Sequence, residues 1–395
     1  RHLRLRATGA AAIGSRVGLV GPLAGIRLVE LAGLGPAPFC AMLLADLGAE
    51  VIRVDRPLGN GIGGMDRVTC RNRRSLGLDL KHEEAVLILL DLVAESDVLL
   101  EGFRPGVAER LGFGPDRCTA TNPRLIYGRM TGWGQSGPLA RRPGHDINYI
   151  ALTGALDSIG SAGGRPVPPL NLVGDFGGGA LYLAVGVLAA LHERTRSGRG
   201  QVIDAAMVDG ATSLMSMVYE LRELGLWEGE RGTNLLDGGC PFYDTYQTAD
   251  GGYMAVGALE PQFFEILMER LGIDRSDKPA QYDATGWMDM RREFAEAFRN
   301  GTRAEWTELF SATDACVTPV LSMAEAPRHA GNVARNTFID VAGSMQPGPA
   351  PRFSRSVPEP PGPSPDSGEH TDEILAEIGL DSGRVADLRA RGVVH

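Results

Sequence analysis

Apolar segments of strand length alternate with segments of helix length along the first half of the chain. Residues 26–32 are mostly apolar, residues 33–38 form a Gly/Pro-rich turn, and residues 39–47 have the composition of a helix. A further apolar run, residues 51–54, ends at Asp55. A strand, a helix and a second strand in this order predict a βαβ unit.

The alternation continues beyond this first unit. Strand-like runs at residues 75–80, 98–100 and 125–130 are accompanied by a helix-like segment at residues 82–95. Repeated alternation of this kind indicates a parallel sheet with helices packed on its faces. We therefore predict an α/β fold for the first half of the chain.

The pattern changes after a predicted helix at residues 207–224. Residues 243–248 and 253–259 have the composition of two strands joined by Ala-Asp-Gly-Gly, which is a hairpin signal, and helices but no further βαβ units follow. Residues 302–305 and 322–325 have the spacing of capping boxes at helix starts. A smaller α+β domain is expected here.

These patterns divide the chain into four segments. Residues 21–225 form the predicted large α/β domain, and residues 226–328 form the smaller α+β domain. Residues 329–395 include a Pro-rich linker and are expected to return to the large domain. Residues 1–20 carry four arginines and no acidic residue. Transit peptides share this bias with expression scars and upstream translated sequence, and we favour the last two origins.

The net charge argues against a nucleic-acid partner. The 395 residues include 39 lysines and arginines and 49 acidic residues, so the formal net charge at pH 7 is −10. No overall positive field is available to attract a polyanion. The longest uncharged apolar run, residues 176–191, is shorter than the roughly 20 residues that cross a bilayer. We expect a buried helix there and no membrane insertion.

The cysteines indicate a reducing compartment. The sequence contains five cysteines, which are scattered and form no CxxC pair. An odd, dispersed set fits neither a disulfide framework nor a zinc ribbon. We therefore expect a cytoplasmic protein without a metal site.

The turn after the first strand and the arginines around it each allow two interpretations. Asp55 follows the turn at about the spacing of a nicotinamide-binding fingerprint, but Pro38 replaces the third glycine and Pro36 removes a backbone N–H. A structural turn explains this segment better. The nearby arginines either bind a phosphorylated ligand or form a solvated turn; they stand at positions 53, 56, 71, 73, 74, 104 and 110.

Three acid–base candidates stand at corners between predicted elements. His145 lies between a glycine-containing turn and a helix-like segment, where it either acts as a neutral base or hydrogen-bonds the preceding loop. Asp175 lies among glycines before the apolar helix, where it is either a base, a nucleophile or an ordinary N-cap. Glu260 lies between a strand and Pro261, where it either orients an imidazole or is surface charge.

Specific stretches from Gly21 nearly to the end share the style of one enzyme family, among them GPLAGIRLVELAGLGPAPF, RNRRS, EGFRPGVAERLG, GHDINYI, PVPPLNLVGDFGGG and GEHTDEIL. On these motifs the sequence resembles the family III CoA-transferases (the CaiB/BaiF group), most closely the branch that racemises α-methylacyl-CoA thioesters. The resemblance implies a Rossmann-like large domain and an interlocked homodimer whose active sites combine both subunits. It also implies an acyl-CoA substrate, in which CoA is part of the substrate, and no metal or redox cofactor.

The resemblance further implies roles for individual residues. His145 and Asp175 would face opposite sides of the substrate α-carbon, and Glu260 of the partner would pair with His145. The backbone N–H of Asp146, at the expected helix start, is a candidate donor to an enolate oxygen. The residues expected to hold or line the CoA site are Arg56, Arg71, Arg73, Leu78, Leu99, Arg104 and Arg110.

Two reaction classes and one non-catalytic role are open at this stage. Inversion of a carbon next to a thioester needs one group that removes a proton and another that returns one on the opposite face. Epimerisation of 2-methylacyl-CoA thioesters by His145 and Asp175 is therefore the main interpretation. The alternative is CoA transfer with Asp175 as the nucleophile. A catalytically silent CoA-binding protein is the third interpretation.

Overall fold

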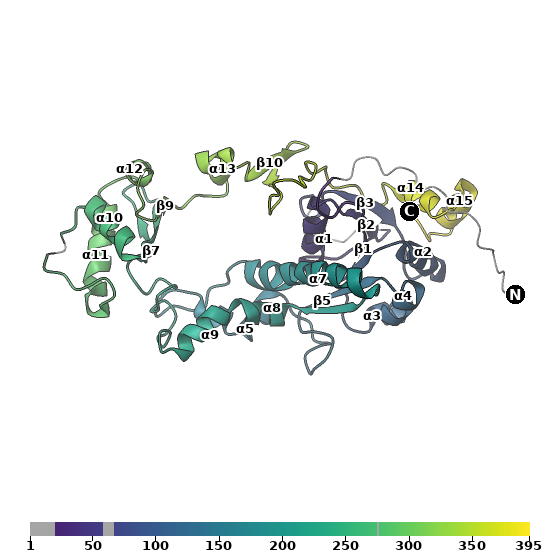
Figure 1. Ribbon diagram of the computed structural model, residues 1–395, viewed down its shortest axis with the longest axis horizontal. Coiled ribbons are helices and arrows are strands. Elements are labelled where there is room, and N and C mark those ends of the chain that lie inside the picture. The colour runs from purple at the N-terminus through teal and green to yellow at the C-terminus, as the bar shows by residue number, and fades with distance from the viewer. Residues whose placement is uncertain (1–19, 58–66, 275) are drawn as a thin grey trace.

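A computed structural model describes residues 20–57, 67–274 and 276–395 of the chain. It contains a large and a small domain, which two separate passages of chain connect (Figure 1). The predicted N-terminal extension, residues 1–20, falls outside the described residues apart from Val20.

A six-stranded parallel sheet forms the centre of the large domain. Its strand order is β3-β2-β1-β4-β5-β6, which is the doubly wound order of Rossmann folds. The predicted α/β fold with a Rossmann-like large domain is confirmed. The strands are β1 (Arg27–Leu31), β2 (Glu50–Asp55), β3 (Arg73–Gly77), β4 (Val98–Glu101), β5 (Ile126–Thr131) and β6 (Val202–Ala206).

Apolar side chains on the two faces of this sheet form separate cores. Leu28 of β1 belongs to one cluster and its neighbour Val29 to the other, because successive strand residues point to opposite faces. Helices contribute side chains to both clusters and so cover both faces of the sheet, which is usual for a parallel sheet. The helices up to residue 158 are α1 (Pro36–Asp46), α2 (Glu83–Ala94), α3 (Val107–Leu111), α4 (Pro115–Thr121), α5 (Asp146–Ala151) and α6 (Ala155–Ser158).

The long apolar helix is only partly buried, whereas the sequence predicted a buried helix. A π-helical segment, η1 (Leu172–Ala180), continues into α7 (Leu181–Ser197), and together they are long and apolar enough to cross a membrane. Leu183 and Val187 pack in the core, whereas Leu181 is 47% and Val185 64% exposed. The sheet covers only one side of α7, so this core helix keeps an uncovered apolar face.

The predicted helix at residues 207–224 is two helices, α8 (Met207–Leu214) and α9 (Ser216–Glu223). The hydroxyl of Ser216 donates to the Ser213 carbonyl at 2.6 Å. A serine hydroxyl that bonds a carbonyl of the preceding turn competes with the helical hydrogen-bond pattern. This local competition accompanies the break at Met215.

The small domain has its own antiparallel sheet and aromatic core. The predicted hairpin is confirmed, because β7 (Tyr243–Gln247) pairs with β8 (Tyr253–Gly257), and β9 (Val317–Pro319) completes the sheet. Its core is rich in phenylalanine rings. The helical elements are α10 (Pro261–Leu271), η2 (Ala284–Gly286), α11 (Trp287–Phe298) and α12 (Arg303–Phe310).

The two predicted capping boxes have different outcomes. Thr302 and Glu305 exchange side-chain and backbone hydrogen bonds at the start of α12, as predicted. Ser322 and Glu325 make the same exchange, but only a 3-10 turn, η3 (Ala326–Arg328), follows.

The chain returns from the small domain to the large one through α13 (Ala330–Ala334) and a hairpin of β10 (Phe338–Val341) and β11 (Ser344–Pro347). It ends in α14 (Thr371–Glu377) and α15 (Ser382–Ala390), which lie beside the sheet of the large domain in Figure 1. Residues of α14 and α15 are buried in the core on the α2 face of the sheet. The large domain is therefore built from both ends of the described chain.

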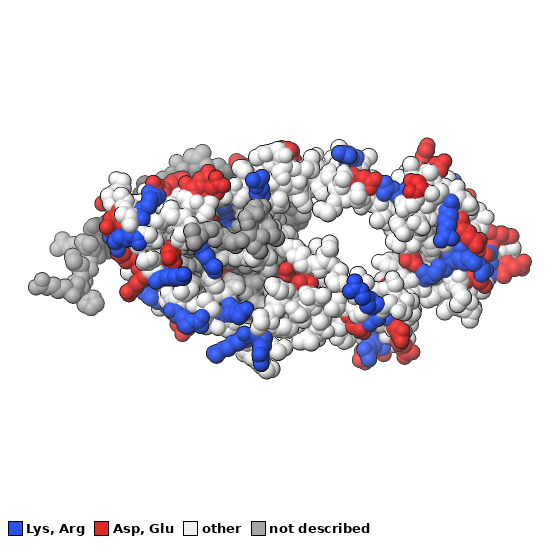
Figure 2. All heavy atoms as spheres, turned by 180° about the vertical axis from the view of Figure 1, so that it is seen from behind, with Lys and Arg blue, Asp and Glu red and all other residues white. Residues whose placement is uncertain are grey.

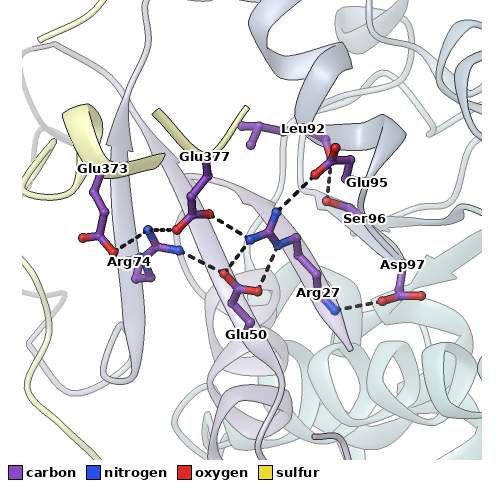
Figure 3. Close-up of polar contacts among 9 residues, drawn as sticks. All are labelled: Arg27, Glu50, Arg74, Leu92, Glu95, Ser96, Asp97, Glu373 and Glu377. Atoms are coloured by element: carbon purple, nitrogen blue, oxygen red, sulfur yellow. Dashed lines mark hydrogen bonds and ion pairs between the residues drawn. The ribbon is translucent and has the colours of Figure 1, made fainter. Parts of the chain in front are cut away.

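Ion pairs fasten α14 to the sheet (Figure 3). The Arg27 guanidinium of β1 pairs with Glu50 of β2 and Glu377 of α14, both at 2.9 Å. Arg74 of β3 pairs with the same two glutamates at 3.0 and 2.7 Å, and with Glu373 at 2.9 Å. Because the Arg27 side chain is only 7% exposed, this arginine is the least solvated cation of the network.

We expect Arg27→Met to lower the free energy of unfolding by about 2 kcal/mol or more, because Glu50 and Glu377 each lose a poorly solvated partner. Urea denaturation followed by circular dichroism measures the change. Arg384→Met is the control: Arg384 of α15 pairs with Glu84 in a more exposed setting. Equal losses of unfolding free energy in the two variants would contradict the larger contribution expected of Arg27.

Candidate active site

A cleft of about 640 Å³ opens at the carboxyl ends of the central strands. The segments after β1, β4 and β5 line it, together with the loop before α5 and part of η1. β1 and β4 are neighbours at which the strand order reverses, and ligands of open α/β sheets bind at such a switch point. The titratable residues that line the cleft are Arg56, Arg104, Arg142, His145, Tyr149 and Asp175.

His145 occupies the N-cap position of α5. Its backbone is extended, and its N–H donates to the Asn148 side-chain oxygen at 3.0 Å. The Tyr149 hydroxyl donates to the carbonyl of Gly144, the residue before His145, and the Tyr149 ring packs edge-on against Trp133. These contacts fix the turn that presents the exposed His145 side chain to the cleft.

Asp175 lies half-buried in η1. One carboxylate oxygen accepts a hydrogen bond from the Asn171 amide at 3.1 Å. Burial raises the pKa of Asp175; the Asn171 hydrogen bond lowers it, the nearby Asp146 carboxylate raises it, and His145 lowers it. The net effect is a pKa above the usual aspartate value.

Asn171 was missed by the sequence reasoning. It precedes Asp175 by four residues, which is the spacing of helical neighbours. The sequence placed the helix start after Asp175, so that spacing carried no signal. A π-helical segment that begins at Leu172 changes this, and π-helical turns are frequent at functional sites.

Two glycines let the backbone approach the acidic side chains of the site. A Cβ on Gly174 would lie 2.4 Å from a carboxylate oxygen of Asp146. Gly35, with φ of 74°, ends the turn after β1, and its Cβ would lie 3.4 Å from the Asp175 carboxylate. The first βα turn and Asp175 therefore lie close together in the cleft lining.

Three of the predicted CoA-binding arginines are exposed. Arg56, at the end of β2, and Arg104, after β4, line the cleft. Arg110 of α3 lies outside the lining and donates to the Gly106 carbonyl at 3.2 Å. The cleft thus has at least two cations that a phosphorylated ligand can reach.

Arg71 and Arg73 are placed inside the protein instead. Arg71 pairs with Asp46 at 2.6 Å, and Arg73 pairs with Glu30 at 3.0 Å; all four side chains are at most 1% exposed. Arg73 also donates to the Pro38 carbonyl in the first turn of α1 at 2.6 Å. Internal partners hold both guanidinium groups, and neither arginine belongs to the cleft lining, so this structure does not place them where a ligand in the cleft would reach them.

Leu78 and Leu99, which we expected to line the CoA site, lie in the core on the α2 face of the sheet. Both are at most 1% exposed, and neither belongs to the cleft lining. Leu99 is a central residue of β4, so its side chain packs beneath α2. We assign both residues to the core.

Asp55, the acidic residue on which the nicotinamide interpretation depends, does not line the cleft. Asp55 is buried and accepts hydrogen bonds from Arg53 Nε at 2.9 Å and from the Ser75 hydroxyl at 2.6 Å. A carboxylate that is engaged in this way does not face a ribose in the cleft. The preferred interpretation of the first turn as a structural one agrees with this placement.

A buried ion pair positions the loop that carries Arg104. Glu101 accepts a hydrogen bond from the Phe103 N–H at 2.6 Å and from Arg129 Nε at 2.9 Å. Burial raises the pKa of Glu101, and the Phe103 N–H and Arg129 oppose the shift. The sequence reasoning missed this pair, because its partners come from β4 and β5 and are 28 residues apart.

Glu260 lies at the start of α10 in the small domain and is exposed. Gln281 and Tyr282 both donate to the Leu259 carbonyl, at 2.8 and 2.6 Å, and so hold this corner. Glu260 does not belong to the cleft lining. The structure of one chain brings His145, Asp146 and Asp175 together and leaves Glu260 apart from them.

The part of the chain that the structure describes contains no group of three or more His, Cys, Asp and Glu residues with metal-binding geometry. Independently of that, His145 and Asp175 both line the cleft, and imidazole and carboxyl groups commonly transfer protons in enzymes.

Comparisons with known proteins identify relatives over nearly the whole chain. The sequence model of CoA-transferase family III matches residues 23–371. The chain is 49% identical to alpha-methylacyl-CoA racemase of Mus musculus and 48% identical to that of Homo sapiens, in both cases over 94% of this chain and 97% of the relative. It is 32% identical to the succinyl-CoA–L-malate CoA-transferase beta subunit of Chloroflexus aurantiacus, over 94% and 98%.

Solved structures show the same architecture. A CAIB/BAIF family protein from Brucella suis superimposes with a TM-score of 0.80 at 27% identity, covering 91% of this chain and all of the other. Rv3272 from M. tuberculosis gives a TM-score of 0.76 at 28% identity, covering 90% and 99%.

We expect Gly174→Ala to lower the free energy of unfolding by about 1–3 kcal/mol, because the new Cβ would collide with the Asp146 carboxylate. Urea denaturation measures the loss. Gly33→Ala is the matched control: it also lies at the cleft, but its Cβ would meet only a backbone oxygen at 3.9 Å. If Gly174→Ala loses no more unfolding free energy than Gly33→Ala, η1 accommodates the new Cβ without destabilisation and the expectation is wrong.

Proposed function

The chain belongs to CoA-transferase family III, and from that premise we propose that it epimerises 2-methylacyl-CoA thioesters at the α-carbon. The observation that carries the proposal is the presence of two different acid–base groups, His145 and Asp175, in one cleft. The near full-length similarity to the mouse and human racemases supports the same reaction.

The reaction is a proton transfer with two bases. One group removes the α-proton, and the electron pair of the C–H bond moves into the thioester carbonyl to give an enolate. The other group then returns a proton to the opposite face of the carbon. The raised pKa of Asp175 suits it to donate when His145 accepts, and the reverse direction exchanges the roles. The backbone N–H of Asp146 is our candidate donor to the enolate oxygen.

The CoA moiety is bound as part of the substrate. Arg56 and Arg104 supply positive charge at the cleft, and a guanidinium pairs well with phosphate. Arg110 of α3 lies close in sequence to the cleft-lining loop and is the third candidate. The proposed reaction moves protons only, so it needs neither a metal nor a redox cofactor.

We also propose an interlocked homodimer as the active form. An apolar face of α7, made of Leu181, Tyr182, Val185 and Leu188, is exposed in the single chain, and such faces mark protein contacts. Figure 2 shows an opening through the molecule between the two domains. A partner subunit that threads this opening would cover α7 and bring its Glu260 to His145.

The compartment we propose is the cytoplasm. Cys40, Cys118 and Cys240 are buried free thiols, and Cys316 is an exposed one. Buried free thiols without a disulfide are usual in reducing compartments.

CoA transfer is the second candidate. A carboxylate at the position of Asp175 can attack a thioester, and the similarity to a CoA-transferase beta subunit supports this chemistry. The two reactions differ in whether Asp175 forms a covalent bond.

We expect a 2-methylacyl-CoA of either configuration to take up solvent deuterium at the α-carbon and to become a mixture of epimers without an acceptor acid. His145→Ala should slow epimerisation in both directions by about 10²-fold, because each direction uses both groups. Mass spectrometry and chiral chromatography measure exchange and inversion. His82→Ala, which changes an exposed histidine outside the cleft, is the matched control.

The transferase alternative has a different signature. It requires retained configuration after many turnovers and an Asp175 adduct that hydroxylamine traps. Both results together would replace the racemase assignment.

The shared active site can be tested by complementation. His145→Ala and Glu260→Ala homodimers should each be weak, and mixing them under conditions of subunit exchange should restore activity at one site of each mixed dimer. Size-exclusion chromatography with light scattering gives the oligomeric state. Full activity of a monomer, or absence of any restoration in verified mixed dimers, would contradict the arrangement.

A further inference from the structure

Asp146 is the residue that connects the two candidate bases. It directly follows His145 and is the first residue of α5. Its side chain is 93% buried, and one carboxylate oxygen accepts a hydrogen bond from the backbone N–H of Asp175 at 2.7 Å. A helix that begins with one base therefore holds the backbone of the other.

The packing around this contact leaves Asp146 little freedom. Gly174, the residue before Asp175, lies so close to the Asp146 carboxylate that a Cβ there would come within 2.4 Å of it. α5 and η1 are packed against each other at this point. The Gly-Asp pair in η1 and the His-Asp pair at the start of α5 thus form one interlocking contact.

We propose that the Asp146 carboxylate is a positioning residue that orients Asp175 and favours its protonated form. The catalytic meaning of this assignment rests on the proposed function, whereas the electrostatic effect on Asp175 does not. The sequence motif suggested a use only for the Asp146 backbone N–H. The carboxylate has a separate use, directed at the opposite base.

The charges around Asp175 support this assignment. Asp146 of α5 contributes a negative charge that raises the pKa of Asp175, while Asn171 and His145 lower it. Tyr149 of α5 interacts electrostatically with Asp175 and with Arg104. Two further cations, Arg56 and Arg142, line the same cleft. Asp146 is the acidic side chain among the groups named around Asp175. Removal of its negative charge should therefore lower the pKa of Asp175.

Asp146→Asn tests the charge separately from the hydrogen bond. The amide oxygen can still accept the Asp175 N–H, but the negative charge is gone. A small diazo compound esterifies protonated carboxyls, and peptide mass spectrometry reports the labelling of Asp175 at each pH. The midpoint of Asp175 labelling should move to lower pH in Asp146→Asn than in the unmodified protein.

Asp204→Asn is the matched control for this measurement. The Asp204 carboxylate also accepts a backbone N–H, from Gln135 at 3.0 Å, but it lies outside the cleft lining. Its substitution should leave the Asp175 midpoint in place. Asp146→Ser, a smaller neutral acceptor, serves if the asparagine variant does not fold.

Activity provides the second readout. The limb of the pH profile of kcat/KM that belongs to Asp175 should move to lower pH in Asp146→Asn, since a carboxyl with a lower pKa stays ionised further into acid. Asp146→Ala should in addition reduce kcat about tenfold or more, because the Asp175 backbone loses its acceptor.

The outcomes separate the two proposals. An unchanged Asp175 labelling midpoint in folded Asp146→Asn or Asp146→Ser overturns the role of the carboxylate, whatever the enzyme catalyses. A shifted midpoint in a protein that epimerises nothing supports that role and contradicts only the proposed function.

Discussion

The buried ion pair between Arg73 and Glu30 connects β3 to β1, the strand that leads into the turn lining the cleft. Arg73 lies on β3 and Glu30 on β1, so the two buried side chains span the intervening strand β2. The same guanidinium donates to the Pro38 carbonyl at the start of α1. Removal of one partner would leave an uncompensated buried charge, which typically costs about 3–5 kcal/mol. The turn between β1 and α1 is fixed in this way, and it lines the cleft together with Asp175.

Most of the architecture followed from local pattern, whereas the assignments of the arginines did not. Period-two and helical patterns are local, so the βαβ units and the hairpin of the small domain could be predicted. Whether an arginine faces a ligand or a buried carboxylate depends on residues distant in sequence: Asp46 for Arg71 and Glu30 for Arg73. The sequence gives these arginines the same appearance as Arg56, which does line the cleft.

The site residues show the same division. His145 and Asp175 stood out because chemically active side chains at element corners are visible in a sequence. Asn171 did not, because the sequence placed the helix start after Asp175, whereas in the structure a helical segment begins directly after Asn171. The exposed side of α7 was missed for another reason: its apolar composition predicts burial, and a single chain covers one side only.

The covering of β3 has a consequence for the order in which the protein is made. β3 is an outer strand of the sheet, and its backbone groups bond to residues near the other end of the chain: the Ser75 carbonyl accepts from the His370 N–H, and the Gly77 N–H donates to the Thr371 hydroxyl. Unpaired strand edges are sites of aggregation. During synthesis this edge stays open until the ribosome has produced the whole small domain and the return passage. An open edge at that stage can pair with another copy of the nascent chain.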